Sequence, residues 1–363
     1  MRIGILSPIA WRTPPRAYGP WELVASNLAE GLVAGGHDVT LFATADSITA
    51  GRLEAVAPRG YEEDPSVTPK VWEALHIAHA MEQAGRFDLL HNHFDFLPLA
   101  WSRLIPVPLV TTIHGFSSPA ILPVYQEYVH DVFYVSISDA DRDPTLRYEA
   151  TVYNGIDPAL FTFRPAPGEY AVSFGRIHPD KGVHLAIEAA RRAGVRLVIA
   201  GIVHDRAYFT RSVEPHVDGD RVRYVGNLGP VDRDRLLGGA LALLHLVAFD
   251  EPFGLAMTEA MACGTPVIGT RRGAVPEVIE EGESGFLVDD VDGAVEALGR
   301  VREIDRTRCR RRVEKRFTVD RMVDGYVAVY ERVLRAWAGR HDRTTSPGES
   351  RPESSPGAGA ALA

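Results

Sequence analysis

Two glutamates with a defined spacing are the first residues that could do chemistry. The stretch Phe249-Asp-Glu-Pro-Phe-Gly-Leu-Ala-Met-Thr-Glu259 holds Glu251 before a Pro-Phe-Gly turn and Glu259 within a helix-forming run. If the helix begins at Leu255, its rise of 1.5 Å per residue separates the two glutamates by about 12 Å. Paired carboxylates of glycosidases lie roughly 5 to 9.5 Å apart. The spacing therefore does not favour a catalytic acid–base pair.

The segment between the two glutamates suggests an anion site. At the start of such a helix, the backbone N–H groups of Phe253, Gly254 and Leu255 are free, and the helix dipole favours a group such as diphosphate. A carboxylate on either side can accept hydrogen bonds from hydroxyl groups. The pattern predicts a diphosphate with a polyhydroxylated group at each end, as in a nucleotide sugar. The alternative is a surface glutamate and an ordinary helix charge, because this spacing also occurs by chance.

Two cations in Ser173-Phe-Gly-Arg-Ile-His-Pro-Asp-Lys-Gly182 support the anion site. Arg176 follows a predicted strand and Lys181 comes five positions later, in a strand–loop–helix unit. Ligands of α/β domains bind at the ends of strands, so both cations are expected to hold a diphosphate and stabilise it as it leaves. The alternative is a pair of solvated surface residues.

Short apolar runs alternate with helical segments along the chain, which predicts an α/β protein of two Rossmann-like domains that face each other across a cleft. We expect an N-terminal acceptor-binding domain over residues 1–165 and a nucleotide-sugar-binding domain over 166–320. An amphipathic helix over 321–338 is expected to pack back on the first domain. Residues 339–363, rich in Gly, Ser, Pro and Ala, are expected to form a disordered tail.

Composition narrows the class of protein. The chain has 363 residues, 45% of them apolar and 24% charged, which is typical of a soluble globular protein. A net charge of −9 argues against nucleic acid as the main partner. The two cysteines, Cys263 and Cys309, and the lack of a leader pattern favour the cytoplasm. No apolar run approaches the length of a membrane span.

The run Glu251-Pro-Phe-Gly-Leu-Ala-Met-Thr-Glu259-Ala-Met-Ala-Cys-Gly-Thr-Pro-Val-Ile268 resembles the signature of the family 4 retaining glycosyltransferases, which have the GT-B fold. Gly175-Arg176 with Lys181-Gly182 and Tyr153-Asn-Gly-Ile-Asp157 also match, and the resemblance extends from Met1 to about Trp337. It implies that Arg176 and Lys181 bind the donor diphosphate, Glu251 the sugar hydroxyls and Glu259 the nucleotide ribose. It also implies that no metal or other cofactor is needed, since the cations replace the metal.

The resemblance places a histidine near the transferred sugar, and His114 in Val110-Thr-Thr-Ile-His-Gly115 matches that place. Without the resemblance, a hydrogen-bonded packing residue is the better interpretation of this histidine. The nearby His91-Asn-His93 pair is weak evidence for a metal, because no further ligands cluster with it.

The family usually has Gly-Gly at the start of the first helix, but here the pair is Gly19-Pro20, so one N–H that could bind phosphate is absent. Gly19 is still expected to contribute. Leu228 lies in the loop expected to contact the base, Gly226 to Gly229. The long loop from Pro8 to Trp21 is predicted to face the acceptor, because aromatic faces suit sugar surfaces. The acceptor candidates are Trp11, Tyr18, Trp21 and His93.

These features predict a retaining transferase that moves a hexosyl group from a nucleoside diphosphate sugar to an acceptor hydroxyl. UDP is preferred because it is frequent in the family, and a soluble small molecule or glycan is preferred over a lipid acceptor. The loop and composition are similar to those of family 4 enzymes of avilamycin-type antibiotic assembly. The alternatives are a GT-B sugar-nucleotide epimerase, a starch-type synthase and a non-catalytic nucleotide-sugar-binding protein. A dehydrogenase is disfavoured, because no Gly-x-Gly-x-x-Gly turn follows the first strand.

Overall fold

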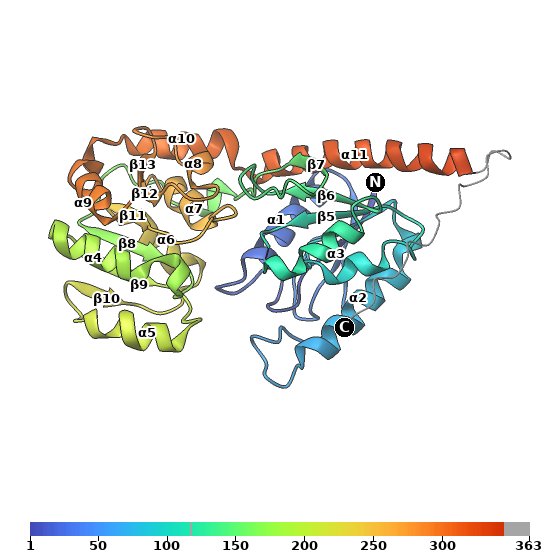
Figure 1. The fold of residues 1–363 in the computed structure, drawn as a ribbon, viewed down its shortest axis with the longest axis horizontal. Helices are drawn as coiled ribbons and strands as arrows, with labels where there is room; N and C mark the ends of the chain where they lie inside the picture. Colours follow the sequence, from blue (N-terminus) through green and yellow to red (C-terminus); the bar gives the residue numbers. More distant parts are fainter. Residues whose placement is uncertain (117, 345–363) are drawn as a thin grey trace, which may run out of the picture.

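The protein consists of two parallel α/β halves joined by a linker and by the last helix (Figure 1). The computed structural model describes residues 1–116 and 118–344. The first half holds a seven-stranded sheet of order β3-β2-β1-β4-β5-β6-β7, and the second a six-stranded sheet of order β10-β9-β8-β11-β12-β13. This arrangement confirms the predicted pair of Rossmann-like domains.

In the first half, helices cover both faces of the sheet, so its central strands are buried along almost their whole length. Its elements are β1 (Arg2–Leu6), α1 (Pro20–Ala34), β2 (Asp38–Phe42), β3 (Arg52–Glu54), α2 (Pro69–Glu82), β4 (Leu89–Asn92), β5 (Leu109–Ile113), α3 (Leu122–Glu127), β6 (Val132–Ser136) and β7 (Tyr148–Thr151).

The second half also alternates strands and helices. Its elements are β8 (Tyr170–Phe174), α4 (Val183–Ala193), β9 (Arg196–Ala200), α5 (Arg206–Ser212), β10 (Val222–Tyr224), α6 (Pro230–Gly238), β11 (Ala242–His245), α7 (Leu255–Ala262), β12 (Val267–Thr270), α8 (Val275–Val278), β13 (Gly285–Val288), α9 (Val291–Arg300) and α10 (Arg306–Arg316).

The last helix, α11 (Val319–Thr344), leaves the second half and lies along the first (Figure 1). Its buried side chains, among them Met322, Tyr326 and Tyr330, join the core formed by α1 and the strands of the first sheet. The helix runs past Gly339, so the predicted start of the tail is too early. One glycine weakens a helix by only about 1 kcal/mol relative to alanine, so Gly339 need not end it. The rest of the predicted tail, 345–363, lies outside the described residues.

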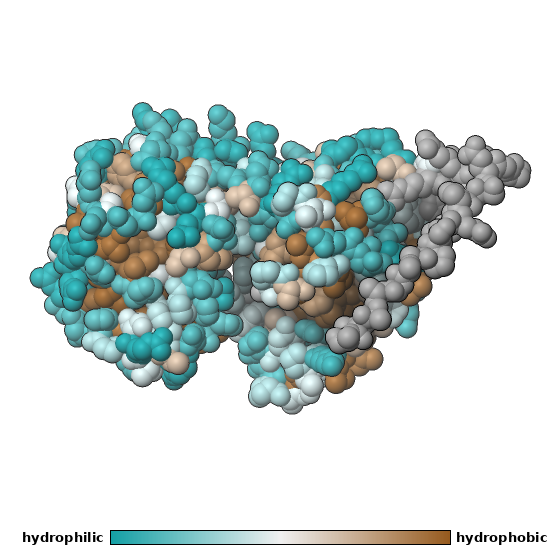
Figure 2. Space-filling model, viewed as in Figure 1, coloured by the Kyte–Doolittle hydropathy of each residue, from teal (hydrophilic) through white to brown (hydrophobic). Residues whose placement is uncertain are grey.

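Each sheet has one point where the strand order reverses, between β1 and β4 in the first half and between β8 and β11 in the second. Loops that leave the carboxyl ends of such strands diverge and leave a crevice that binds ligands. The two halves also meet with a notch between them, visible in the space-filling view (Figure 2). Among residues 1–116 and 118–344, no helix is both long enough and apolar enough to span a bilayer.

Candidate functional site

The loops after β8 and β11 bring Lys181 and Glu251 together. The Lys181 Nζ atom lies 2.5 Å from Glu251 Oε2, and Lys181 also lies over the ring of Phe249, 4.6 Å from its centroid. Glu251 is 5% exposed. The predicted cation and the predicted sugar-binding carboxylate are therefore direct neighbours at the reversal point of the second sheet.

A backbone contact explains how Lys181 reaches this place. Gly182 has a φ of 63°, and a Cβ atom there would lie 1.8 Å from the carbonyl oxygen of Leu246. Only glycine permits both the left-handed conformation and this close approach. The turn that carries Lys181 can thus pack directly against the chain leaving β11.

A histidine that the sequence did not single out completes the surroundings of Glu251. The Nε2 atom of His245, the last residue of β11, lies 3.1 Å from Glu251 Oε2, the same oxygen that Lys181 contacts. Burial alone would raise the pKa of Glu251, but the charge of Lys181 and the hydrogen bond from His245 lower it to about 2. Glu251 is therefore ionised throughout the neutral range.

Arg176 follows β8 and is partly exposed. Within residues 1–116 and 118–344 it forms no ion pair and no hydrogen bond. Its charge acts on Tyr18 of the first half, whose pKa burial raises to about 12. Arg176 is thus a cation without a carboxylate partner at the domain boundary, where it can accept an anion.

The start of α7 agrees with the prediction from the sequence. The helix begins at Leu255, after Gly254 with a φ of 86°. The N–H groups of Phe253, Gly254 and Leu255 donate no hydrogen bond to any residue that the structure describes. They remain available for an anion between the two glutamates.

Glu259, in α7, faces α6 and pairs with a second residue that sequence reasoning missed. The Nη1 atom of Arg233 lies 3.3 Å from Glu259 Oε1, while Arg233 Nε and Glu259 Oε2 are buried with no partner in the described part of the chain. Burial raises the pKa of Glu259, and the charge of Arg233 opposes this. One hydrogen-bond donor and one acceptor therefore remain unsatisfied in this buried pair.

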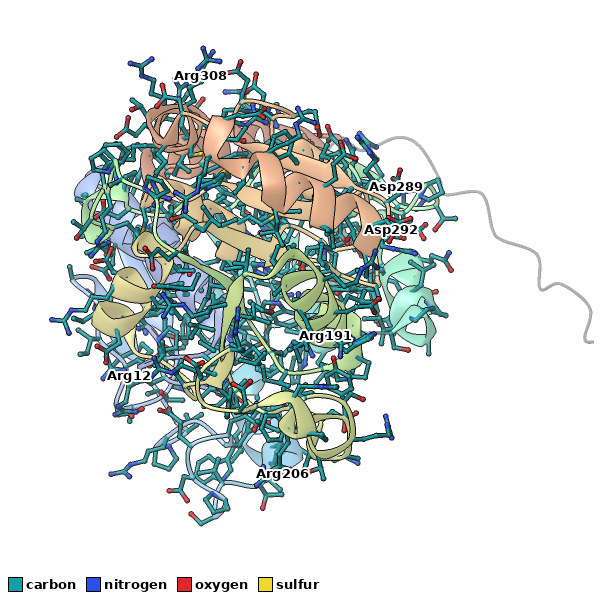
Figure 3. All side chains as sticks on the ribbon, turned by 90° about the vertical axis from the view of Figure 1, so that its left-hand side faces the viewer. Arg12, Arg191, Arg206, Asp289, Asp292 and Arg308 are labelled. Carbon is teal, nitrogen blue, oxygen red and sulfur yellow. The ribbon has the colours of Figure 1, made fainter. Side chains whose placement is uncertain are left out.

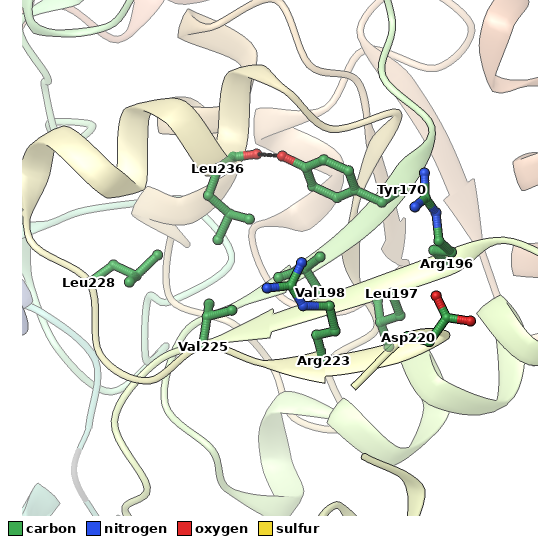
Figure 4. A pocket seen from close by; sticks show the side chains of 9 residues that line it. All are labelled: Tyr170, Arg196, Leu197, Val198, Asp220, Arg223, Val225, Leu228 and Leu236. Atoms are coloured by element: carbon green, nitrogen blue, oxygen red, sulfur yellow. Dashed lines mark hydrogen bonds between the residues drawn. The ribbon is translucent and has the colours of Figure 1, made fainter. Parts of the chain in front are cut away.

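The predicted base-binding residue Leu228 lines a different feature. With Val225 and Leu236 it borders a cavity of about 320 Å³ between α6 and strands β9 and β10 (Figure 4). Tyr170 Oη donates a hydrogen bond of 2.8 Å to the Leu236 carbonyl at one side of this cavity. Leu228 thus lies just before α6, and Arg233 lies within that helix.

In the first half, His114 follows β5 and is 8% exposed. Its ring stacks on Trp21 at a centroid distance of 5.5 Å, and its Nε2 atom lies 2.9 Å from Nδ1 of His93. His93 is completely buried behind His114. The predicted direct contact of His93 with an acceptor is therefore wrong, because no surface of its side chain is open.

Behind these residues, a polar network joins the first sheet to the last helix. His91 is bonded through Nδ1 to Tyr330 Oη at 2.7 Å and through Nε2 to Thr112 Oγ1 at 2.8 Å. Thr112 in turn lies 2.7 Å from Tyr326 Oη. Both nitrogens of His91 are thus engaged with protein groups, and within the described ranges no group of three or more potential metal ligands occurs.

The loop after β1 reaches the second half. A Cβ atom on Gly229 would lie 3.7 Å from the Arg16 carbonyl oxygen, and the rings of Trp11 and Tyr18 meet edge to face at 6.0 Å. Gly19 has a φ of 148°, and an added Cβ would lie 2.8 Å from Pro15, so the loop needs glycine before α1.

The two halves touch directly beside Glu251. A Cβ on Gly115 would lie 2.6 Å from Pro252 Cγ. Glu277 of α8 accepts hydrogen bonds from the backbone N–H groups of Asp139 and Ala140, at 3.0 and 2.7 Å, and from Tyr153 Oη at 2.8 Å. His114 and Glu251 therefore belong to loops that the folded chain holds against each other.

Comparison with known proteins decides the family. The model described as Glycosyltransferase Family 4 matches residues 22–160, and the model described as Glycosyl transferases group 1 matches residues 162–316. The chain is a family 4 glycosyltransferase. The two matches leave out β1, the first two residues of α1, and α11.

The glycosyltransferase is similar to glycogen synthase of Mycobacterium tuberculosis, with 28% identity over 76% of this chain and 80% of that protein. Its fold is similar to that of AviGT4, a glycosyltransferase involved in avilamycin A biosynthesis, with 23% identity, a TM-score of 0.70 and coverage of 92% and 98% of the two chains. It is also similar to Anabaena Alr3699/HepE, solved with UDP-glucose, with 19% identity, a TM-score of 0.68 and coverage of 93% and 100%.

Proposed function

We propose that the protein is a retaining hexosyltransferase that uses a nucleoside diphosphate sugar, with UDP preferred, and an acceptor hydroxyl. One observation supports this most strongly: a buried, ionised Glu251 lies beside Lys181, and the charges of Glu251 and Arg176 both act on Tyr18 of the first half. His114 is on the facing loop. Cations for a diphosphate and hydrogen-bonding groups for a sugar thus meet at one boundary. Structural relatives solved with UDP or UDP-glucose support the choice of nucleotide.

In the proposed reaction, the bond between the anomeric carbon and the donor phosphate oxygen breaks. Arg176, Lys181 and the free N–H groups at the start of α7 stabilise the charge that develops on the diphosphate. The acceptor oxygen bonds to the anomeric carbon on the same face, and its proton passes to the departing phosphate oxygen. The step balances, because the sugar moves to the acceptor oxygen and the acceptor proton moves to the departing diphosphate. In this scheme the side-chain cations Arg176 and Lys181 take the part of a metal.

Glu251 and His114 orient the sugar in this scheme. Lys181 and His245 both contact Oε2 of Glu251, and Oε1 has no hydrogen bond among the described residues, so Oε1 is placed to accept from sugar hydroxyls. Trp21, which stacks on His114, and the loop from Pro8 onward border the same place from the acceptor side. The proposed acceptor is a soluble small molecule or glycan, as in antibiotic assembly.

The test is incubation of the purified protein with UDP-sugars, with and without a panel of acceptors, in buffer with and without EDTA. Proton NMR of the product would show retention as an α-linkage formed from an α-linked donor. Transfer that survives EDTA is expected. An epimer formed without acceptor would instead establish an epimerase, and donor binding without transfer or hydrolysis would favour a binding protein.

A further inference from the structure

The contact between His93 and His114 restricts where each ring carries its proton. A neutral imidazole has one N–H and one bare nitrogen, so in the contact of 2.9 Å between His93 Nδ1 and His114 Nε2 one nitrogen must donate and the other accept. Burial keeps both rings neutral: it lowers the pKa of His114 to about 3 and that of His93 well below its usual value. Two tautomeric arrangements remain.

The other nitrogen of His93 distinguishes them. His93 Nε2 is buried and has no hydrogen-bond partner within residues 1–116 and 118–344. If His114 Nε2 were the donor, His93 would carry its proton on Nε2, and a buried N–H would be left unsatisfied. If His93 Nδ1 is the donor, Nε2 is a bare nitrogen. A buried unpaired N–H is rarer in folded proteins than an under-used acceptor, so the second arrangement is favoured.

The neighbours of His93 do not offer another solution. The ring of His91 lies 4.2 Å away, but its two nitrogens are bonded to Tyr330 and Thr112. Tyr326, whose ring is 6.4 Å from that of His93, is bonded to Thr112. The groups around His93 are therefore already paired, apart from His114.

We propose that His93 is a positioning residue that donates from Nδ1 to His114 Nε2 and so holds His114 in its Nδ1–H tautomer. His114 then offers a hydrogen-bond donor, Nδ1–H, to an oxygen of the bound sugar. It does not act as the base that takes the acceptor proton, because its only bare nitrogen is occupied by His93. The assignment to a sugar oxygen rests on the proposed function; the tautomer itself does not.

This inference sharpens the reaction scheme. With His114 unable to accept a proton at either nitrogen, the acceptor proton must pass to another group, which agrees with the departing phosphate oxygen as its destination. The stacked ring of Trp21 fixes the plane of His114, and His93 fixes its rotation within that plane. A single hydrogen-bond direction toward the sugar follows.

The direct test is long-range nitrogen NMR of protein labelled at its histidine imidazoles, at pH 7.5 and without substrate. The His114 signals are identified by comparison with His114→Gln. The expected pattern is a protonated Nδ1 and a bare Nε2, opposite to the tautomer that free histidine prefers in water. A protonated Nε2 on His114 would overturn the proposal, and this result does not depend on any activity.

Variants of His93 test the consequence for catalysis. His93→Phe should return His114 to the Nε2–H tautomer and lower kcat about 10- to 100-fold, with little change in KM for the donor. His93→Gln keeps an N–H donor and should recover part of the rate. His79→Gln, on α2 away from the site, is the control. If His93→Phe changes neither the NMR pattern nor kcat, the positioning role is wrong; if it does not fold, the NMR of the unaltered protein still decides.

The outcomes also separate this inference from the proposed function. If His114 is protonated at Nδ1 but the protein transfers no sugar, the tautomer is established and the proposed transferase function is wrong. If the protein transfers sugar but His114 is protonated at Nε2, the transferase function stands and the positioning role of His93 is wrong.

Discussion

At the scale of single residues, one carboxylate oxygen of each of the two glutamates is paired with a protein group and the other is not. Lys181 and His245 converge on one oxygen of Glu251, so the protein neutralises this buried charge without using both acceptors. Glu259 is arranged in the same manner with Arg233, through Oε1 only. Each carboxylate therefore has one oxygen without a partner among the described residues, as the proposed donor with hydroxyls at both ends would require.

Arg233 provides a prediction about the nucleotide end. Burial raises the pKa of Glu259, and Arg233→Met removes the charge that opposes this shift, so the pKa should rise further and the carboxyl group should become a weaker acceptor for ribose hydroxyls. We expect the Kd for UDP, measured by calorimetry, to rise about tenfold, or about 1.4 kcal/mol. The matched control is Arg235→Met, since Arg235 lies on the same helix with 72% of its side chain exposed. Equal affinities of the two variants would contradict a role for Arg233.

The sequence suggested Arg176, Lys181, Glu251 and Glu259 because each belongs to a short segment with its own spacing. His245 and Arg233 could not be found in this way. Each meets its glutamate through the packing of separate elements, and an isolated histidine in an apolar strand or an arginine on a helix is usually structural. The one available signal was a charged or polar residue in a buried run, as with His245 in Ala-Leu-Leu-His.

At the scale of elements, the loop before α1 is held by Glu22, a residue that no sequence motif singles out. Its carboxylate accepts a hydrogen bond of 3.2 Å from the Trp11 N–H, and it is buried within the first turn of the helix. Burial raises the pKa of Glu22 to about 7. The loop that borders the proposed acceptor site is therefore anchored by a group that titrates near neutral pH.

This gives a prediction about stability and pH. The pKa of Glu22 is higher in the folded protein than in the unfolded chain. Its contribution to the free energy of unfolding is therefore fully present below the unfolded pKa of 4.5 and is lost as the pH rises through about 7. Glu22→Gln cannot ionise, so the fall in unfolding free energy between pH 5 and pH 8 should shrink by roughly 1 to 3 kcal/mol. Urea unfolding at the two pH values measures it. Burial also raises the pKa of Asp141 to about 7. Part of the decrease in unfolding free energy should therefore remain in Glu22→Gln, because Asp141 still ionises.

The exposed variant Glu62→Gln is the control for Glu22, since it removes a nearby carboxylate at the surface. If both variants lose as much unfolding free energy between pH 5 and pH 8 as the unaltered protein does, the assignment of this titration to Glu22 is wrong.

The arginine-rich helix α10 shows why composition alone misleads about an element. Its many arginines would suit a solvated basic face, and Arg308 does point outward at the rim of the second half (Figure 3). Arg306, however, is 5% exposed and donates to the carbonyl oxygens of Arg164, Gly238 and Ala240. These bonds tie the linker between the halves to the second core, and nothing in the spacing of the arginines reveals which one does so.

At the scale of the whole molecule, the alternation of apolar runs and helices was enough to predict two parallel α/β domains. The contacts between the domains were not predictable, because they join residues far apart in sequence through a few side chains. Glu277 is the main example, since it accepts three hydrogen bonds from the opposite half. A glutamate after a proline carries no local sign of such a role.

Glu277 therefore supports a prediction about domain arrangement. Glu277→Ala should weaken the contact between the halves, so small-angle scattering should give a larger radius of gyration and the rate of sugar transfer should fall. UDP binding, which depends on the second half, should change little. Glu280 follows α8 and pairs with Arg312 of the same half, so Glu280→Ala is the control. An unchanged radius and an unchanged rate would show that Glu277 does not hold the domains together.

The central claim is that Glu251 and Glu259 hold opposite ends of one donor, and calorimetric titration of UDP into Glu251→Gln and Glu259→Gln tests it most directly. Glu259→Gln should weaken UDP binding about tenfold or more, because it lies at the ribose end. Glu251→Gln should bind UDP as the unaltered protein does, yet lose sugar transfer. Equal losses of UDP affinity in both variants would contradict the account.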